Sequence, residues 1–244
     1  MSAVCVSIFL YADDILLIAP SISGLQTLVN ICERELTNID MSINAKKSFC
    51  IRFGPRFNAN CEHIVSLSGV EFDWVDKCRY LGVFFVSGRQ FRCSFDNAKR
   101  LFFISFNSIF SKVGRSASEE VILSLLRSKC IPLLLYGVEA CPFFGRDKHS
   151  FDFSLTRIFM KLFRTGSAAV VTECQKQFCF LPLKLQVDIR TASFMLKFTA
   201  SENTICNLFS AQAARTLAEI NVRYGNSVGS INSLKDAVLR QFNV

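Results

Sequence analysis

Histidine is scarce in this sequence, and cysteine pairs with metal-ligand spacing are missing. The 244 residues include two histidines, His63 and His149, and none of the eleven cysteines belongs to a C-x-x-C pair. Structural zinc sites depend on such spacings, so the sequence argues against a zinc site. An odd number of cysteines without a pairing pattern is typical of reduced thiols in a protein core. We therefore expect an intracellular, reducing location.

Long apolar runs without a charge, proline or glycine are also not evident in the sequence. A membrane helix needs about 20 apolar residues, and the best candidate, residues 131–144, contains two prolines, a glycine and a glutamate. The N-terminus lacks the basic segment that begins a secretory signal. We therefore expect neither a membrane span nor a membrane partner.

What the sequence does contain is apolar material and an uneven charge. Half of the residues are hydrophobic and 25 are phenylalanine, which excludes a disordered chain and suits one large domain or two small ones. The net charge is −4 over residues 1–76, +9 over 77–164 and +3 over 165–244. A basic segment suits a polyanionic partner, although a solvated helix face explains the same bias.

The first third of the chain has strand periodicity around one helix. Strand-like runs at residues 4–10 and 15–19 flank Tyr11-Ala12-Asp13-Asp14, which predicts a β-hairpin that turns at the aspartates. After Pro20, Ser21 or Ser23 can cap a helix. Apolar residues at helical spacing follow: Leu25, Leu28, Val29, Cys32, Leu36 and Ile39. Further strands are expected at residues 49–53, 65–67, 70–74 and 80–86, with a loop at 54–63.

The rest of the chain has helical periodicity. One apolar stripe consists of Phe95, Ala98, Phe102, Phe106, Ile109 and Val113. Gly114 should end that helix, Ser118 should begin the next, and Pro132 should kink or end it. A third helix is expected over 151–162, and others at 170–180, 184–200, 204–220 and 230–242. The predicted fold class is α+β, with a strand-rich part followed by an all-helical part.

The adjacent aspartates carry the strongest chemical signal. Burying two neighbouring carboxylates is costly unless a cation or several donors compensate, whereas a solvated turn avoids that cost. Tyr-Ala-Asp-Asp between apolar strands resembles the Y-x-D-D box of reverse transcriptases. Three later segments resemble LINE-type (non-LTR) retrotransposon enzymes in order: N-x-x-K-S at residues 44–48, R-Y-L-G-V at 79–83 and P-x-x-x-Y-G at 132–137.

This resemblance implies a right-hand polymerase. Residues 1–88 would form the end of its palm, which is a small antiparallel sheet with a packed helix. The strands of this part would include a primer-grip hairpin. Residues 89–165 would form a helical thumb, and 166–244 a helical extension of unknown role. The implied activity is DNA synthesis on an RNA template from a DNA primer and deoxynucleotides with two Mg²⁺ ions. The implied location is the nucleus, while the oligomeric state stays open.

The resemblance also implies roles for individual residues. Asp13 would be the principal metal ligand and Asp14 a more peripheral one, which suits the preference of Mg²⁺ for hard oxygens. Lys47 would protonate the leaving pyrophosphate, unless it is simply an exposed lysine at a strand end. Tyr80 would pack beside the primer, and Gly82 would lie in the same hairpin. The alternative is that Tyr80 is an aromatic residue of the core. Phosphate contacts are expected from Lys99, Arg100, Lys112 and Arg115.

Only ten residues precede Tyr11, whereas the family carries fingers and another palm aspartate upstream. We therefore expect a truncated enzyme that is inactive as this chain. Two alternatives are a non-catalytic nucleic-acid-binding remnant that uses its basic helices, and a helical domain with chance matches.

Overall fold

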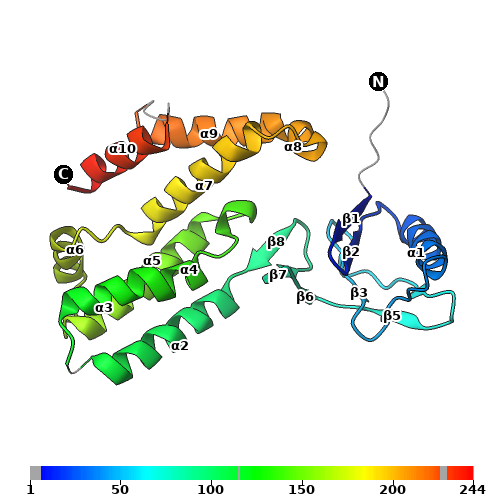
Figure 1. Cartoon of the computed structure of the whole chain (residues 1–244), viewed down its shortest axis with the longest axis horizontal. Coiled ribbons are helices and arrows are strands. Elements are labelled where there is room, and N and C mark those ends of the chain that lie inside the picture. The colour runs from blue at the N-terminus through cyan, green and yellow to red at the C-terminus, as the bar shows by residue number, and fades with distance from the viewer. Residues whose placement is uncertain (1–6, 115, 226–229, 244) are drawn as a thin grey trace. The chain divides into compact units, whose positions relative to one another are not determined.

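The chain divides into two units between Cys93 and Ser94. The computed structural model describes residues 7–114, 116–225 and 230–243. Figure 1 shows the N-terminal unit in blue to cyan and the helical unit that follows it in green to red. The mixture of helices and small sheets confirms the α+β class, while the palm, thumb and extension boundaries at 88 and 165 stay predictions.

A hairpin and one helix begin the N-terminal unit. Strand β1 (Ile8–Tyr11) pairs antiparallel with β2 (Asp14–Leu17), while residues 4–6 of the expected first strand lie outside the described part. Helix α1 (Ile22–Thr37) begins as predicted, because the Ser21 hydroxyl accepts a hydrogen bond from the Gly24 amide at 3.1 Å.

Two further sheets complete this unit. The first has the strand order β3 (Phe49–Cys50), β5 (Glu71–Trp74) and β4 (Ile64–Val65). It is mixed, because β3 runs parallel and β4 antiparallel to β5. The second has the order β6 (Lys77–Tyr80), β7 (Val83–Val86) and β8 (Arg92–Ser94). The expected antiparallel pairing is thus found in all three sheets, and the β3–β5 pair departs from it.

The core of the N-terminal unit is small. It contains the buried side chains of Val29, Cys50, Ile64 and Phe72. Trp74 lies at its edge, where its indole N–H donates to the Glu62 carbonyl at 3.1 Å and the Arg52 guanidinium carbon lies 5.0 Å from its ring centroid.

Three details of the sequence prediction fail in this unit. The expected strand at 49–53 is only two residues long, and Cys50 is buried while Phe49 is 43% exposed. The expected strand at 80–86 is the second arm of a hairpin, because the chain turns at Leu81 and Gly82. Ile39 is exposed, because helix α1 ends before it.

The core of the helical unit is rich in phenylalanine. Phe102, Phe106, Phe151, Phe159 and Phe180 are fully buried. Its α-helices are α2 (Asp96–Val113), α3 (Glu119–Leu125), α4 (Ile131–Leu134), α5 (Gly145–Leu162), α6 (Ala168–Gln177), α7 (Leu183–Thr199), α8 (Thr204–Leu208), α9 (Ser210–Arg223) and α10 (Ile231–Asn243). Helices α2, α5, α7 and α9 pack in succession, and α10 packs on α7 (Figure 1).

Several predicted helix boundaries in this unit are confirmed, whereas the helix expected over 151–162 already begins at Gly145. Gly114 follows α2 and Ser118 precedes α3, although the Ser118 hydroxyl makes no capping hydrogen bond. The helix expected over 204–220 is divided into α8 and α9, because the backbone leaves the helical region at Phe209.

Pro132 does not interrupt its helix in the expected way. A π-helical segment (Leu126–Cys130) joins α3 to α4, and Pro132 lies in the first turn of α4. The helix is continuous through this point, and the wider π-helical turn directly before the proline accommodates the residue that cannot donate an N–H to it. The combined stretch, Glu119–Ala140, is 22 residues long and apolar enough to cross a membrane.

The expectation that the chain has no helix long and apolar enough to cross a membrane is therefore wrong. These two criteria do not separate a membrane helix from the core helix of a soluble protein. Leu126 and Leu134 in this stretch are fully buried, and α2 packs against it.

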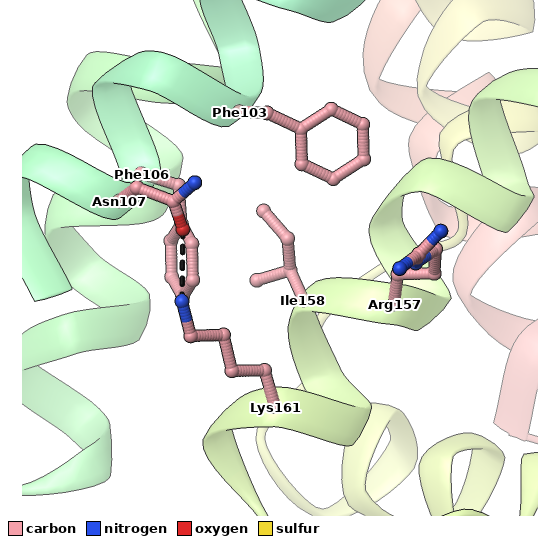
Figure 2. Close-up of a pocket in the computed structure, with 6 residues that line it drawn as sticks. All are labelled: Phe103, Phe106, Asn107, Arg157, Ile158 and Lys161. Carbon is pink, nitrogen blue, oxygen red and sulfur yellow. Dashed lines mark hydrogen bonds between the residues drawn. The ribbon is translucent and has the colours of Figure 1, made fainter.

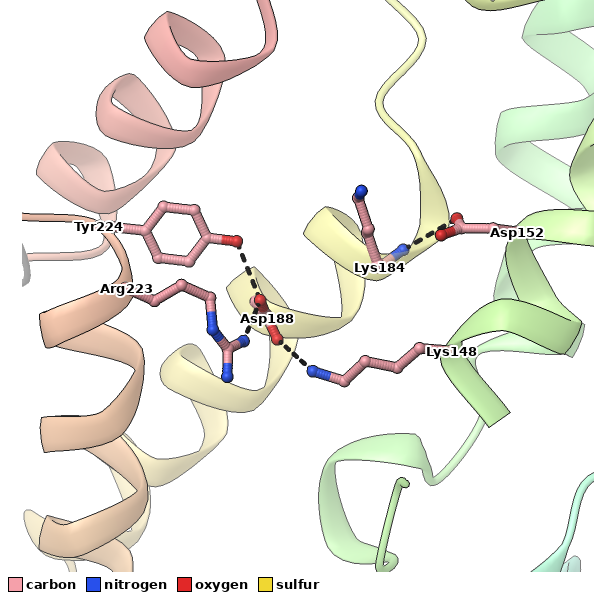
Figure 3. Close-up of polar contacts among 6 residues, drawn as sticks. All are labelled: Lys148, Asp152, Lys184, Asp188, Arg223 and Tyr224. Carbon is pink, nitrogen blue, oxygen red and sulfur yellow. Dashed lines mark hydrogen bonds and ion pairs between the residues drawn. The ribbon is translucent and has the colours of Figure 1, made fainter. Parts of the chain in front are cut away.

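One buried carboxylate links three helices of this unit. Asp188 of α7 is 6% exposed and accepts hydrogen bonds from Lys148 of α5 at 3.2 Å and Tyr224 at 2.9 Å, and from Arg223 of α9 (Figure 3). Burial and the Asp188 charge raise the pKa of the Tyr224 hydroxyl. The phenol therefore stays a hydrogen-bond donor over the whole physiological pH range.

A second carboxylate acts at the start of α7. Asp152 of α5 accepts a hydrogen bond from the Lys184 amide at 3.2 Å, in the first turn of α7 (Figure 3). Burial raises the pKa of Asp152, while the amide hydrogen bonds and the Lys184 charge partly oppose that change. The start of α7 is thus held by α5 rather than by a residue of its own.

We predict that Asp188→Asn lowers the free energy of unfolding of the helical unit by about 2 kcal/mol, because it leaves two cations facing a neutral group. Partial exposure of Lys148 and Arg223 keeps the loss below that of a fully buried ion pair. Urea unfolding followed by circular dichroism measures this difference. The control is Asp236→Asn on α10, an exposed position. Equal stability of the two variants would contradict the prediction.

Candidate functional site

The Y-x-D-D segment forms the tip of the β1–β2 hairpin. Tyr11 pairs with Asp14 at the last register position, so Ala12 and Asp13 form a two-residue turn. Ala12 has a φ of 53°, a left-handed conformation that such turns require but that alanine adopts at some cost. The predicted hairpin with its aspartates at the turn is therefore confirmed.

Both carboxylates at this tip are open to solvent. Asp13 and Asp14 are exposed, and within the described residues neither side chain accepts a hydrogen bond or pairs with a cation. Their charges are therefore uncompensated by the protein, which favours either solvent or a bound cation. Whether both reach one ion stays a prediction.

The site supplies two acidic ligands and no more. Across residues 7–114, 116–225 and 230–243, no three His, Cys, Asp or Glu side chains are grouped so that they could hold a metal. Carboxylate oxygens are the ligands that Mg²⁺ prefers, and this ion keeps waters and substrate phosphates in its shell. The donor set thus fits one weakly held Mg²⁺ and is incomplete for a pair of ions.

The strands that carry the aspartates are only partly buried. Leu17 packs against the core of the N-terminal unit, whereas Leu10 is 71% and Tyr11 is 64% exposed. A two-stranded hairpin is marginally stable alone. The contact of β2 with the core therefore fixes the position of the hairpin turn relative to the N-terminal unit.

Lys47 lies in a turn immediately before β3. Its amide donates to the Asn44 carbonyl at 3.0 Å, and its side chain is exposed. Within the described residues, no hydrogen bond or ion pair joins it to Asp13 or Asp14. The structure thus places it where a strand-end lysine would lie, and its role as a general acid stays a prediction.

Tyr80 ends the first strand of a second hairpin, and Gly82 lies in its two-residue turn. Leu81 and Gly82 have φ values of 45° and 83°, as in the mirror-image turns that join tight hairpins. The Tyr80 ring is partly buried, with its centroid 6.0 Å from that of Phe85. Both the core-aromatic interpretation and a primer contact remain compatible with this position.

The predicted phosphate contacts on α2 differ in availability. Lys99 pairs with Asp96 at 3.0 Å and donates to the Ser150 hydroxyl of α5 at 3.1 Å, so it links two helices. Arg100 is exposed and donates to Asn97 within α2. Lys112 is exposed near the end of that helix. Arg115 lies outside the described residues.

Sequence reasoning missed a hollow between α2 and α5. Figure 2 shows the six residues that line it: Phe103, Phe106, Asn107, Arg157, Ile158 and Lys161. The spacing of Arg157 and Lys161, one helical turn apart, was visible in the sequence. Their approach to Asn107, which is far away along the chain, was not.

Residues 2–85 match the sequence model of the family described as reverse transcriptase (RNA-dependent DNA polymerase). The match covers the hairpin with Asp13 and Asp14, the turn with Lys47, and Tyr80 with Gly82. It ends before α2, so it says nothing of the helical unit. No curated protein and no solved structure matches the chain. The resemblance of the N-terminal segment to reverse transcriptases is thus confirmed at the level of the family.

Proposed function

We propose that the N-terminal unit is the last part of the palm of an RNA-directed DNA polymerase of the non-LTR retrotransposon type. The observation that carries this proposal is the family match over residues 2–85, with Asp13 and Asp14 at the tip of a hairpin. The non-LTR assignment is supported by the segments at 44–48 and 79–83 that follow in order.

In this proposal Asp13 and Asp14 hold Mg²⁺, which fits their exposed and unpaired carboxylates. The bound ion would activate the primer 3′ oxygen and stabilise the charge of the leaving pyrophosphate. The hairpin holds the two carboxylates on a short turn anchored to the core, so they are positioned before the substrate arrives. A complete two-metal centre needs at least one further acidic ligand.

Three other features have roles in the proposal. Lys47 protonates the pyrophosphate, which a lysine near phosphates can do. The turn at Leu81 and Gly82 presents Tyr80 to the primer. The helical unit acts as a thumb on the RNA template and DNA primer, with deoxynucleotides as substrates. A reducing location, the nucleus in such elements, is supported by the odd number of cysteines and by the lack of a C-x-x-C pair in the sequence.

A second candidate is nucleic-acid binding without catalysis. Basic side chains are exposed along the helical unit: Arg100, Lys112, Arg127, Lys129, Arg146, Arg157, Lys161 and Arg164. No three His, Cys, Asp or Glu side chains of the described residues are grouped so that they could hold a metal ion. In this candidate function the basic side chains contact phosphates, as in the polymerase, but the protein does not catalyse nucleotidyl transfer.

We predict that the protein binds Mn²⁺, a paramagnetic substitute for Mg²⁺, at the hairpin. Asp13→Asn should weaken this binding at least about tenfold, or 1.4 kcal/mol, because it removes half of the ligand charge. Electron paramagnetic resonance of free Mn²⁺ measures the affinity. Glu35→Gln, an exposed acid on α1, is the control and should change nothing. Binding that is the same in both variants would overturn the metal site.

We predict no measurable primer extension by the 244-residue chain on an RNA template with Mg²⁺. Two carboxylates do not fix two ions about 3.5–4 Å apart. Lost alignment of the reactants costs roughly 7–11 kcal/mol, and each 1.36 kcal/mol is about tenfold in rate. Incorporation of labelled deoxynucleotides is the assay. Metal-dependent synthesis that disappears in Asp13→Asn would instead show a complete polymerase centre.

We predict that duplex binding by the chain weakens steeply with salt, because it depends on phosphate contacts. The slope of log affinity against log salt should be roughly −0.9 per contact. Arg100→Gln and Lys112→Gln should each make the slope less steep by about one contact, and Lys235→Gln on α10 should leave it unchanged. Fluorescence anisotropy at several salt concentrations provides the slopes. A flat response, or no binding at low salt, would refute phosphate binding.

A further inference from the structure

Two cysteines of the N-terminal unit lie on segments that approach one another. Cys50 ends strand β3 and is 8% exposed, whereas Cys61 lies in the loop that leads to β4 and is partly exposed. Both thiols are free. One of them therefore belongs to the core, while the other can be reached from solvent.

Trp74 of β5 contacts both of these segments. Its backbone is the register partner of Cys50 in the parallel pair of β3 and β5. Its indole N–H donates at 3.1 Å to the carbonyl of Glu62, which directly follows Cys61 in the chain. A single residue of β5 thus holds the end of β3 and the end of the loop in the same neighbourhood.

The loop between the two cysteines is closed by a second contact. The Arg52 guanidinium donates to the Ala59 carbonyl at 2.6 Å. Arg52 comes two residues after Cys50, and Ala59 comes two residues before Cys61. The two ends of the loop therefore meet on both sides of the cysteines, at Arg52 with Ala59 and at Trp74 with Glu62.

The ionisation of Cys50 responds to Cys61. Burial, and to a smaller extent the charge of Cys61, raises the pKa of the Cys50 thiol to about 11. A neighbouring charge has this effect only over a short distance. Because the thiolate is the reactive form of cysteine, Cys50 reacts slowly at neutral pH, and the partly exposed Cys61 meets an oxidant first.

We propose that Cys50 and Cys61 are a redox-active pair that a low-molecular-weight disulfide converts into an intramolecular disulfide. A disulfide needs α-carbons about 4.4–6.8 Å apart. The loop before Cys61 contains no helix or strand, so it can adjust to this distance while β3 stays in the sheet. The inference goes beyond the proposed function, which gives neither cysteine a role.

The exchange takes place in two balanced steps. The Cys61 thiolate attacks one sulfur of the small disulfide, so a mixed disulfide forms and one thiolate leaves. The Cys50 thiolate then attacks the Cys61 sulfur, the mixed disulfide breaks, and the second thiolate leaves. The two leaving thiolates take up the protons that the cysteines lost. Two electrons thus pass from the protein sulfurs to the small disulfide, which is reduced to two thiols.

The same exchange runs backwards when small thiols are in excess. In a reducing compartment both cysteines therefore stay as thiols. The link forms when the oxidised fraction of the small-thiol pool rises, and it then fastens the loop to the end of β3. The pair would act as a reversible redox sensor in the N-terminal unit.

The test equilibrates the protein in glutathione buffers of increasing oxidised fraction and blocks the remaining thiols with N-ethylmaleimide. Trypsin cleaves after Lys47, Arg52, Arg56 and Lys77, so Cys50 and Cys61 fall into the separate peptides 48–52 and 57–77. We expect mass spectrometry to find these two peptides joined at a glutathione ratio that leaves Cys32 reduced. Dithiothreitol should separate them again.

The same equilibrium in concentrated urea shows whether the fold favours the pair. A disulfide that suits the native structure is stabilised by that structure, so its equilibrium constant should be at least about tenfold larger in native buffer than in urea. An equal or smaller constant in the native protein overturns the proposal. Preferential linkage of either peptide to another cysteine overturns it as well.

Two variants provide the matched controls. Cys61→Ser should leave Cys50 reduced at every glutathione ratio that links the pair in the unmodified protein. Cys32→Ser, at another partly exposed position of the same unit, should leave the equilibrium constant unchanged. Oxidation of Cys50 that persists in Cys61→Ser would refute the assignment of the partner. Circular dichroism checks the fold of both variants, and the comparison with urea needs only the unmodified protein.

Discussion

A two-residue turn forces two carboxylates to be neighbours at the tip of the β1–β2 hairpin. Because Tyr11 pairs with Asp14, no other residue can separate the charges or supply a counter-charge from within the turn. The repulsion is relieved by solvent or by a cation. The same geometry makes the site accessible and limits it to two ligands, so any chemistry there depends on further oxygens from substrate or from other acidic groups.

In the helical unit, the charge of a buried carboxylate is compensated by protein groups rather than by solvent. Its buried acid, Asp188, is surrounded by three donors from α5 and α9 and the residue that follows α9. Lys148 and Arg223 therefore hold the helices together through Asp188. Lys99 has a similar structural role, because it links α2 to α5. Other basic side chains, such as Arg100 and Lys112, are exposed on the faces of the helices.

Local sequence patterns were sufficient for the hairpin, the start of α1 and most helices, because each depends on residues adjacent along the chain. Ser21 and Gly114 act within one turn of their own helix, and the turn aspartates act within four residues. The strand at 49–53 was misjudged because burial there depends on β5, which lies more than twenty residues later. Alternation in the sequence favours Phe49 on the inner face, whereas the pairing buries Cys50.

The candidate site was predictable only in part for a similar reason. Asp13, Asp14 and Gly82 are marked by turn chemistry that the sequence shows directly. The approach of Lys161 to Asn107 joins positions 54 residues apart, and the π-helical segment before Pro132 depends on packing against α2. Neither leaves a periodic signal in the sequence, because each follows from how separate helices meet.

The position of Trp74 has a practical consequence. It is the single tryptophan of the chain, and it lies in the N-terminal unit against Arg52 and the Glu62 carbonyl. Its emission therefore reports on that unit alone, while far-ultraviolet dichroism is dominated by the helices that follow Ser94. The chain thus carries a built-in optical label that separates the unfolding of its N-terminal unit from that of its helical unit.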